Sequence, residues 1–182
     1  MMDRIKQITL PDADATHNRR GRLALQEDAS GAQEFYYGLM GELTKVRRTH
    51  IIPNHAVATF EMSWKYDSWN RVQEMIYPDK EKLSYHYDAS GQLQGLTGNK
   101  SYGYNYVQDI GYDKFGQRSY IKYCNGTETT YNYDPKRRRL QGLQAKNQRV
   151  TFMDNAYSFD KVGNILGVAN TTPAGTTIGG NM

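Results

Sequence analysis

Aromatic residues two positions apart recur along this chain, with one polar residue between the members of each pair. A spacing of two places both side chains on one face of an extended strand. Leucine-rich helical stretches are missing, and aromatic residues favour strands. The pattern therefore predicts an all-β chain. The four pairs are Trp64 and Tyr66, Tyr85 and Tyr87, Tyr131 and Tyr133, and Tyr157 and Phe159.

Each aromatic pair is followed by an aspartate and then by a turn signal. The clearest copy is Tyr87-Asp88-Ala89-Ser90-Gly91-Gln92-Leu93. The aspartate side chain can bond the backbone of the following turn, and the glycine can adopt a positive φ. An apolar residue then begins the next strand. We call this predicted reversal the YD turn. Its expected structural positions are Tyr66, Asp67 and Asn70; Tyr87, Asp88 and Gly91; Tyr112, Asp113 and Gly116; Tyr133 and Asp134; and Phe159, Asp160 and Gly163.

Copies of the YD turn are spaced at intervals of repeat-protein length. Two further, weaker copies begin at His17 and Tyr37, and the seven first positions lie 20 to 29 residues apart. The copy at Tyr133 has lost its glycine and gained one residue. Asn125-Gly126 marks a hairpin turn at the other end of a unit. The uneven intervals predict hairpins with loops of variable length, not a strict solenoid.

The repeat divides the chain into three parts. Residues 1–16 give a weak strand signal only, residues 17–168 form the array of about seven units, and residues 169–182 form a Gly/Thr-rich, loop-like tail. Two stretches do not fit the short unit. Residues 49–63 are expected to form a longer connection that contains Pro53, and residues 97–109 have room for an extra strand.

The chain resembles the YD-repeat, or Rhs (rearrangement hot spot), family. The segments YDASGQL, YDKFGQR, FDKVGNI and YDSWNRV carry the resemblance, which covers about residues 17–168. The resemblance implies a continuous twisted β-strip of tandem antiparallel hairpins, part of the shell of a very large bacterial surface or secreted protein. Some family members release a C-terminal toxic domain by self-cleavage in a core segment after the repeats. No match to that segment is found, so we expect an encapsulating role without catalysis or cofactors.

Composition limits which partners and which cellular location can be expected for this chain. The chain has 15 tyrosines and 17 glycines, and its net charge of +4 is too small to imply nucleic acid by itself. The single cysteine, Cys124, excludes a disulfide within the chain. The N-terminal residues lack the apolar region of a signal peptide, and no stretch is long and apolar enough for a membrane span. An extracellular or cell-surface location follows only from the resemblance, which also implies flanking repeats or a C-terminal domain of the parent protein as partners.

Candidate chemistry is sparse. The four histidines lack metal-ligand spacing, and Asp12-x-Asp14-x-Thr16 lacks the glycine and glutamate of a calcium loop. An aspartate at every turn serves the turn more plausibly than catalysis. The sharpest charge cluster is Lys136, Arg137, Arg138 and Arg139. It is either a solvated hairpin tip or a polyanion contact, which leaves a carbohydrate- or polyanion-binding surface module, with a cell-surface glycan as partner, as the alternative function.

Overall fold

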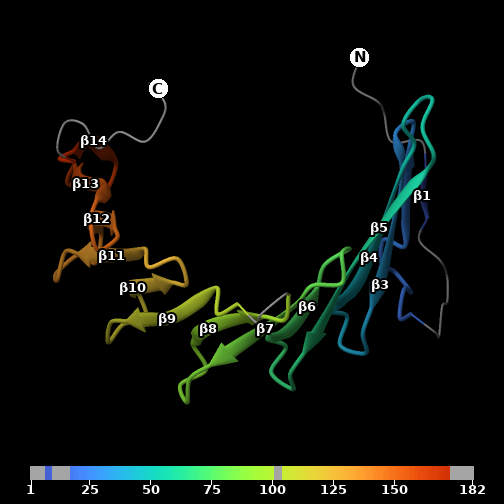
Figure 1. Ribbon diagram of the computed structural model, residues 1–182, viewed down its shortest axis with the longest axis horizontal. Coiled ribbons are helices and arrows are strands. Elements are labelled where there is room, and N and C mark those ends of the chain that lie inside the picture. The colour runs from blue at the N-terminus through green and yellow to red at the C-terminus, as the bar shows by residue number, and fades with distance from the viewer. Residues whose placement is uncertain (1–6, 10–16, 101–103, 173–182) are drawn as a thin grey trace. The chain divides into compact units, whose positions relative to one another are not determined.

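The computed structural model describes residues 7–9, 17–100 and 104–172 of the 182-residue chain. Within these residues the chain forms fourteen β-strands and no helix (Figure 1). Every assigned strand pair is antiparallel and joins strands that are adjacent in the sequence. The predicted fold class, an all-β strip of tandem antiparallel hairpins, is confirmed.

The chain divides into two compact units, residues 1–84 and 85–182, which are described separately. Strand order within each unit follows the sequence. The strands of the first unit are β1 (Gln7–Thr9), β2 (Leu25–Asp28), β3 (Gly31–Tyr37), β4 (Leu43–His50), β5 (Ala58–Tyr66), β6 (Val72–Ile76) and the first half of β7 (Lys82–Tyr87).

The second unit begins within β7 and ends with a long hairpin. Its connections vary in length, as the uneven repeat intervals predict. Its further strands are β8 (Leu93–Gly98), β9 (Val107–Tyr112), β10 (Arg118–Tyr123), β11 (Glu128–Tyr133), β12 (Leu140–Lys146), β13 (Thr151–Phe159) and β14 (Ile165–Asn170).

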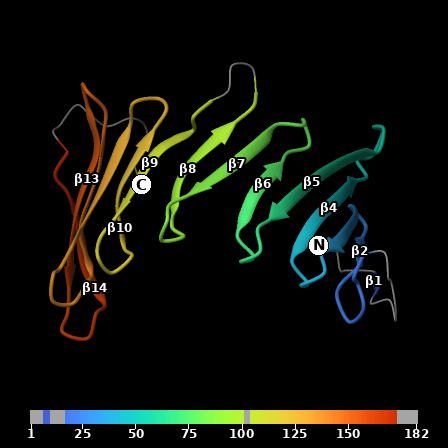
Figure 2. The same cartoon turned by 90° about the horizontal axis from the view of Figure 1, so that it is seen from below.

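YD turns share one edge of the sheet within each unit, because every second connection in an antiparallel strip returns to the same side. In the first unit the β3–β4 and β5–β6 turns emerge together, while the β4–β5 connection emerges at the other end of the strands (Figure 2). We call these two sides the YD edge and the opposite edge. In the second unit the YD edge carries the turns that follow β7, β9, β11 and β13.

Neither unit has a second layer of secondary structure. Among the described residues, strands contact only their neighbours in the sequence, and no large side chain is fully buried. In the second unit, cross-strand pairing aligns Ile110, Ile121, Thr129, Ala145 and Met153 in one row. Ile121 and Thr129, in the middle of this row, are 4% and 9% exposed. Burial here comes from side chains of adjacent strands on one face of the sheet.

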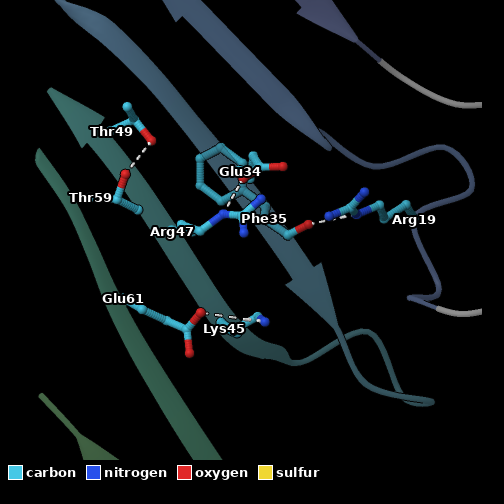
Figure 3. A network of polar contacts seen from close by, with 8 residues as sticks. All are labelled: Arg19, Glu34, Phe35, Lys45, Arg47, Thr49, Thr59 and Glu61. Atoms are coloured by element: carbon cyan, nitrogen blue, oxygen red, sulfur yellow. Dashed lines mark hydrogen bonds and ion pairs between the residues drawn. The ribbon is translucent and has the colours of Figure 1, made fainter. Parts of the chain in front are cut away.

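The two faces of the first unit differ in polarity. Phe35, Val46 and Met62 are directly paired and form an apolar row on one face of β3, β4 and β5. The other face carries cross-strand pairs that match opposite charges or two hydroxyls, a favourable arrangement for neighbouring strands. These pairs are Arg47 with Glu34, Lys45 with Glu61 at 3.5 Å, and Thr49 with Thr59 at 3.2 Å (Figure 3).

Two sequence expectations about connections need correction. Residues 49–63 do not form one long connection, because β4 continues to His50 and β5 begins at Ala58. Pairing of Thr49 with Thr59 extends the ladder over much of this stretch, and Pro53 lies in the loop that remains. In residues 97–109, the described positions add no separate strand: β8 takes the first two, and β9 begins at Val107.

The ends of the array also extend beyond the expected boundaries. β1 lies within residues 1–16, for which only a weak strand signal is expected, and it pairs with β2. β14 includes Ala169 and Asn170, which the sequence reading assigned to the tail. Residues 1–6, 10–16 and 173–182, including the considered calcium loop at Asp12–Thr16, lie outside the described residues.

One side of β14 pairs with β13, and no described strand pairs with its other side. Its side chains are also unusually exposed for apolar residues, at 60% for Ile165, 69% for Leu166 and 54% for Val168. An open strand edge with apolar side chains is a template for pairing with another chain.

We therefore expect the isolated chain to self-associate, and Leu166→Lys with Val168→Lys to shift it toward monomer by adding charge along the edge strand. Sedimentation velocity across a concentration series measures the shift. Val162→Lys is the matched control, because Val162 is 82% exposed at the adjacent turn and not on the strand edge. A wild-type chain that stays monomeric at high concentration, or an equal effect of the control, would contradict the expectation.

Candidate functional site

The YD turns are the candidate site, and the Asp88 turn shows their shared geometry. The backbone N–H of Asp88 donates to the Gln92 carbonyl at 2.8 Å, and that of Gly91 donates to the Asp88 carbonyl at 3.0 Å. Oδ1 of Asp88 accepts the N–H groups of Ser90 and Gln92, both at 2.9 Å. Gly91 has φ +84°, which glycine adopts without a steric penalty. One carboxylate oxygen therefore holds a five-residue turn together.

The same carboxylate arrangement recurs in the other four clear copies. In each, Oδ1 accepts the N–H two residues on and at least one further N–H of the same turn. The fourth residue after the aromatic residue adopts a positive φ in all but the longer turn, where Arg138 takes this role one position later with φ 55°. The donors are Trp69 and Arg71 to Asp67, Phe115 and Gln117 to Asp113, Lys136 and Arg137 to Asp134, and Val162, Gly163 and Asn164 to Asp160.

These hydrogen bonds also favour the ionised carboxylate. The pKa of Asp88 is lowered, first by the Ser90 hydroxyl and then by the Gln92 N–H. Backbone donors lower the pKa of Asp67 and of Asp134. For Asp160, desolvation opposes ionisation, but hydrogen bonds led by the Asn164 side chain outweigh it and the pKa is lowered. Each of these carboxylates therefore accepts hydrogen bonds within its own turn.

The aromatic residue of the motif links each hairpin to the one before it. In four copies the tyrosine hydroxyl donates to a carbonyl at the first residue after the preceding YD turn, at 2.8 or 2.9 Å. Burial raises the pKa of Tyr66 and of Tyr133, so both phenols stay protonated donors at neutral pH. The pairs are Tyr37 to Leu23, Tyr66 to Leu43, Tyr112 to Leu93 and Tyr133 to Arg118.

A second contact runs in the other direction, from the last residue of one YD turn to the next YD turn. Gln117 Nε2 donates to the Arg138 carbonyl at 3.0 Å, and Arg139 Nη1 donates to the Asp160 carbonyl at 2.9 Å. Nε2 of Gln92 lies where a Cβ on Gly116 would meet it at 3.1 Å. The long polar side chain at this position therefore covers the neighbouring turn at its positive-φ residue.

Phe159 has no hydroxyl for the backward link. The hairpins on either side of this position are joined instead by Arg139, whose guanidinium carbon lies 5.7 Å from the centre of the Phe159 ring. Arg139 is half-buried, while Lys136, Arg137 and Arg138 are exposed. Of the four basic residues expected to form a polyanion contact, Arg139 is therefore engaged in joining hairpins.

The weaker copy at Tyr37 keeps the turn without the aspartate. Gly38 stands where the other copies have aspartate, and the place that its Cβ would take is occupied by the Glu42 carboxylate. Glu42 Oε2 accepts the Met40 N–H at 3.0 Å, the same backbone position that donates to aspartate elsewhere. A glutamate four residues later thus supplies the missing carboxylate.

The first copy, at His17, is held to β3 by its turn side chains. Asn18 Nδ2 donates to the Tyr37 carbonyl at 3.2 Å, and Arg19 Nε donates to the Phe35 carbonyl at 2.8 Å (Figure 3). The guanidinium of Arg19 also lies over the Tyr36 ring, 4.2 Å from its centre. This copy lacks the tyrosine and the aspartate, but it keeps the glycine at Gly21 with φ 68° and occupies the same place in the repeat.

Sequence reasoning proposed the turn residues but missed the contacts between turns. Glu42 was not singled out, although a carboxylate within one turn of a missing aspartate is a readable signal. Gln92, Gln117 and Arg139 are each the last residue of a YD turn, and their long polar side chains are a second readable signal. The acceptors of the tyrosine hydroxyls are backbone carbonyls, which no sequence pattern reveals.

The described residues have few features of a metal site, a membrane helix or a disulfide. Within residues 7–9, 17–100 and 104–172, no three metal-binding side chains come together. None of these residues lies in a helix that is long and apolar enough to cross a membrane. Cys124 is a free, exposed thiol.

Comparisons with known proteins agree on the fold. No protein-family profile matches the chain. Toxin subunit YenC1 of Yersinia entomophaga is 28% identical over 130 residues, which cover 66% of this chain and 12% of that protein. A mutant Tc holotoxin pore of Photorhabdus luminescens matches with a TM-score of 0.74 and 19% identity, over 94% of this chain and 9% of that one. The TcdB2–TccC3 crystal structure matches with the same TM-score, identity and coverage.

These matched proteins are Rhs-repeat shell components of Tc toxins, so the predicted resemblance is confirmed. The chain spans only about a tenth of the length of the proteins that it matches.

Tyr112→Phe should lower the free energy of unfolding by about 0.5–1.5 kcal/mol, because it removes one hydrogen bond and keeps the ring. Urea denaturation, in the background of Leu166→Lys and Val168→Lys, measures the loss. Tyr157→Phe is the control, since the Tyr157 hydroxyl makes no hydrogen bond within the described residues. Equal losses in both variants would show that the link to Leu93 contributes nothing.

If the Glu42 carboxylate replaces an aspartate at residue 38, variants at these two positions should have non-additive effects on the free energy of unfolding. Glu42→Ala leaves the Met40 N–H without its acceptor and should cost about 1 kcal/mol. Gly38→Asp alone should also destabilise, because its side chain meets the Glu42 carboxylate. The double variant rebuilds the usual turn and should be more stable than either single variant, which a double-mutant cycle by urea denaturation measures.

The neighbouring turn offers the matched control for this swap. Asp67→Gly alone should destabilise, because residue 71 is an arginine and cannot replace the carboxylate. Asp67→Gly with Arg71→Glu should recover part of the loss. Additive effects in both turns would show that the Glu42 carboxylate does not stand in for an aspartate.

Proposed function

We propose that this chain, a segment with the YD-repeat (Rhs) strip fold, is a stretch of the wall of a protein shell. Its task is structural: it continues a sheet that encloses other parts of a much larger protein. The observation that supports this most is the absence of a second layer over either unit in the described residues. A sheet face with an apolar row needs cover, which a closed shell and its contents supply.

The linkage between hairpins supports the same role. Four YD turns are linked to a later hairpin by a tyrosine hydroxyl, and two YD turns accept a hydrogen bond from a polar side chain of the preceding turn, so these hairpins are stabilised by their neighbours. Such a strip has no natural end, and each added hairpin extends it. The open side of β14, with Leu166 69% exposed, fits a place where the next hairpin of the parent protein pairs.

The proposal includes no catalysis by this segment. The aspartates that recur along it are acceptors for backbone N–H groups and have lowered pKa values in four copies. A carboxylate acting as a general acid requires the opposite shift. Any activity of the parent protein is therefore expected from a region outside residues 17–172.

The parent protein is proposed to be secreted or displayed at the cell surface, and its partners are flanking repeats and an enclosed C-terminal region. The matched proteins are toxin subunits, which supports secretion. A second candidate, binding of a carbohydrate or polyanion, is favoured by one observation: Lys136, Arg137 and Arg138 are exposed together at one YD turn.

The shell proposal is tested on the full parent protein by limited proteolysis. We expect its reading frame to continue beyond both ends of this segment and the region after the repeats to resist protease. Asp88→Ala combined with Tyr112→Phe weakens one YD turn and one link between hairpins, and should raise cleavage of that region several-fold. Tyr157→Phe should leave cleavage unchanged. A C-terminal region that is cleaved equally in all forms, or a gene product confined to these 182 residues, would overturn the proposal.

A further inference from the structure

Basic charge is concentrated at two adjacent YD turns of the second unit. Residues 113–118 and 134–139 together contain six basic and two acidic residues, a net charge of +4. The whole chain also has a net charge of +4, so the remaining residues sum to zero. The basic residues are Lys114, Arg118, Lys136, Arg137, Arg138 and Arg139.

The two acidic residues of these turns are occupied by their own backbones. Oδ1 of Asp113 accepts the N–H groups of Phe115 and Gln117, both at 2.9 Å. Oδ1 of Asp134 accepts those of Lys136 and Arg137, at 2.7 and 2.9 Å. Both carboxylates accept hydrogen bonds from their own turns, and the exposed charged side chains around them are basic.

A recess of about 430 Å³ lies between the two turns. Phe115, Tyr133 and Pro135 give it apolar walls, and Lys114 and Arg138 stand at its rim. The Phe115 ring is 49% exposed. Arg138 Cζ lies 4.3 Å and Lys114 Nζ lies 5.1 Å from the centre of this ring. An exposed aromatic surface is thus bordered by cations on both turns.

The neighbouring YD turns limit how far this surface extends. The tip after β7 is Ala89-Ser90 and carries no charge, and the tip after β13 carries Lys161 alone. Arg139, which faces the latter turn, is bound to the Asp160 carbonyl. Neighbouring strands lie about 4.8 Å apart, so the two basic turns, which are two strands apart, are separated by about 10 Å along the YD edge.

We propose that the paired turns at Asp113–Gln117 and Asp134–Arg139 bind an acidic polysaccharide through Phe115, Lys114, Lys136 and Arg138. The apolar walls of the recess fit the C–H face of a sugar ring, and the rim cations fit its sulfate or carboxylate groups. A short basic stretch with an aromatic wall suits one or two acidic sugars at a time. A nucleic acid would need a basic track that continues along further turns. This site is independent of the shell proposal.

The test measures binding of a size-defined heparin oligosaccharide to the full chain by isothermal titration at several salt concentrations. Lys114→Ser, Lys136→Ser and Arg138→Ser together should weaken binding on the order of tenfold, as three exposed charge contacts are lost. Phe115→Ser should weaken it without any change in charge. Arg139 is left intact because its loss would disturb the link to the next hairpin.

The matched control removes the same charge from the opposite edge of the same strands. A second recess near the β10–β11 and β12–β13 connections is lined by three basic residues, Lys122, Lys146 and Arg149. Replacing all three by serine should change the affinity for heparin less than twofold. Circular dichroism confirms that each variant is folded. Equal weakening by both triple variants, or an unchanged affinity in Phe115→Ser, would overturn the proposal. Tighter binding of a single-stranded oligonucleotide than of heparin at equal salt would overturn it as well.

Discussion

Hairpin-to-hairpin linkage is the interaction on which the rest of this structure depends. A sheet with no second layer cannot bury a core of the usual kind, and only Ala24, Leu83 and Ile121 are buried apolar residues in the described chain. An isolated hairpin is at best marginally stable in water. Cohesion must therefore come from the strand ladders and from contacts between successive YD turns. Both kinds of contact join each hairpin to its neighbours in the sequence.

The motif residues divide this work between them. Aspartate closes its own turn, tyrosine donates to the preceding hairpin, and the last residue of the turn contacts the next turn. Because the tasks are separate, one can be reassigned when a motif residue is lost. Glu42 supplies a carboxylate where Gly38 has none. Where Phe159 has no hydroxyl for the backward contact, the forward contact made by Arg139 still joins the hairpins. Degenerate copies of the repeat can therefore keep its structure.

Much of this fold could be predicted from the sequence, because its signals are local. Aromatic residues at a spacing of two indicate strands, and the aspartate and glycine indicate the turns between them. The length of β4 and β5 was harder to predict, since Thr49 and Thr59 pair through a ladder that continues past the repeat unit. The contacts between turns were also missed, because they join side chains to backbone carbonyls about twenty residues away.

The division of tasks also explains where this surface is free to vary. Linkage uses the tyrosine, the aspartate, the positive-φ residue and the residue after it, and leaves the two tip positions between them exposed. Those positions hold Leu39 and Met40 in one turn, Lys114 and Phe115 in another, and Lys161 and Val162 in a third. Substitutions at these tip positions alter the chemistry of the YD edge with little effect on stability, because surface positions away from structural contacts tolerate substitution. A wall built from such turns can therefore acquire a basic, aromatic recess without losing its linkage.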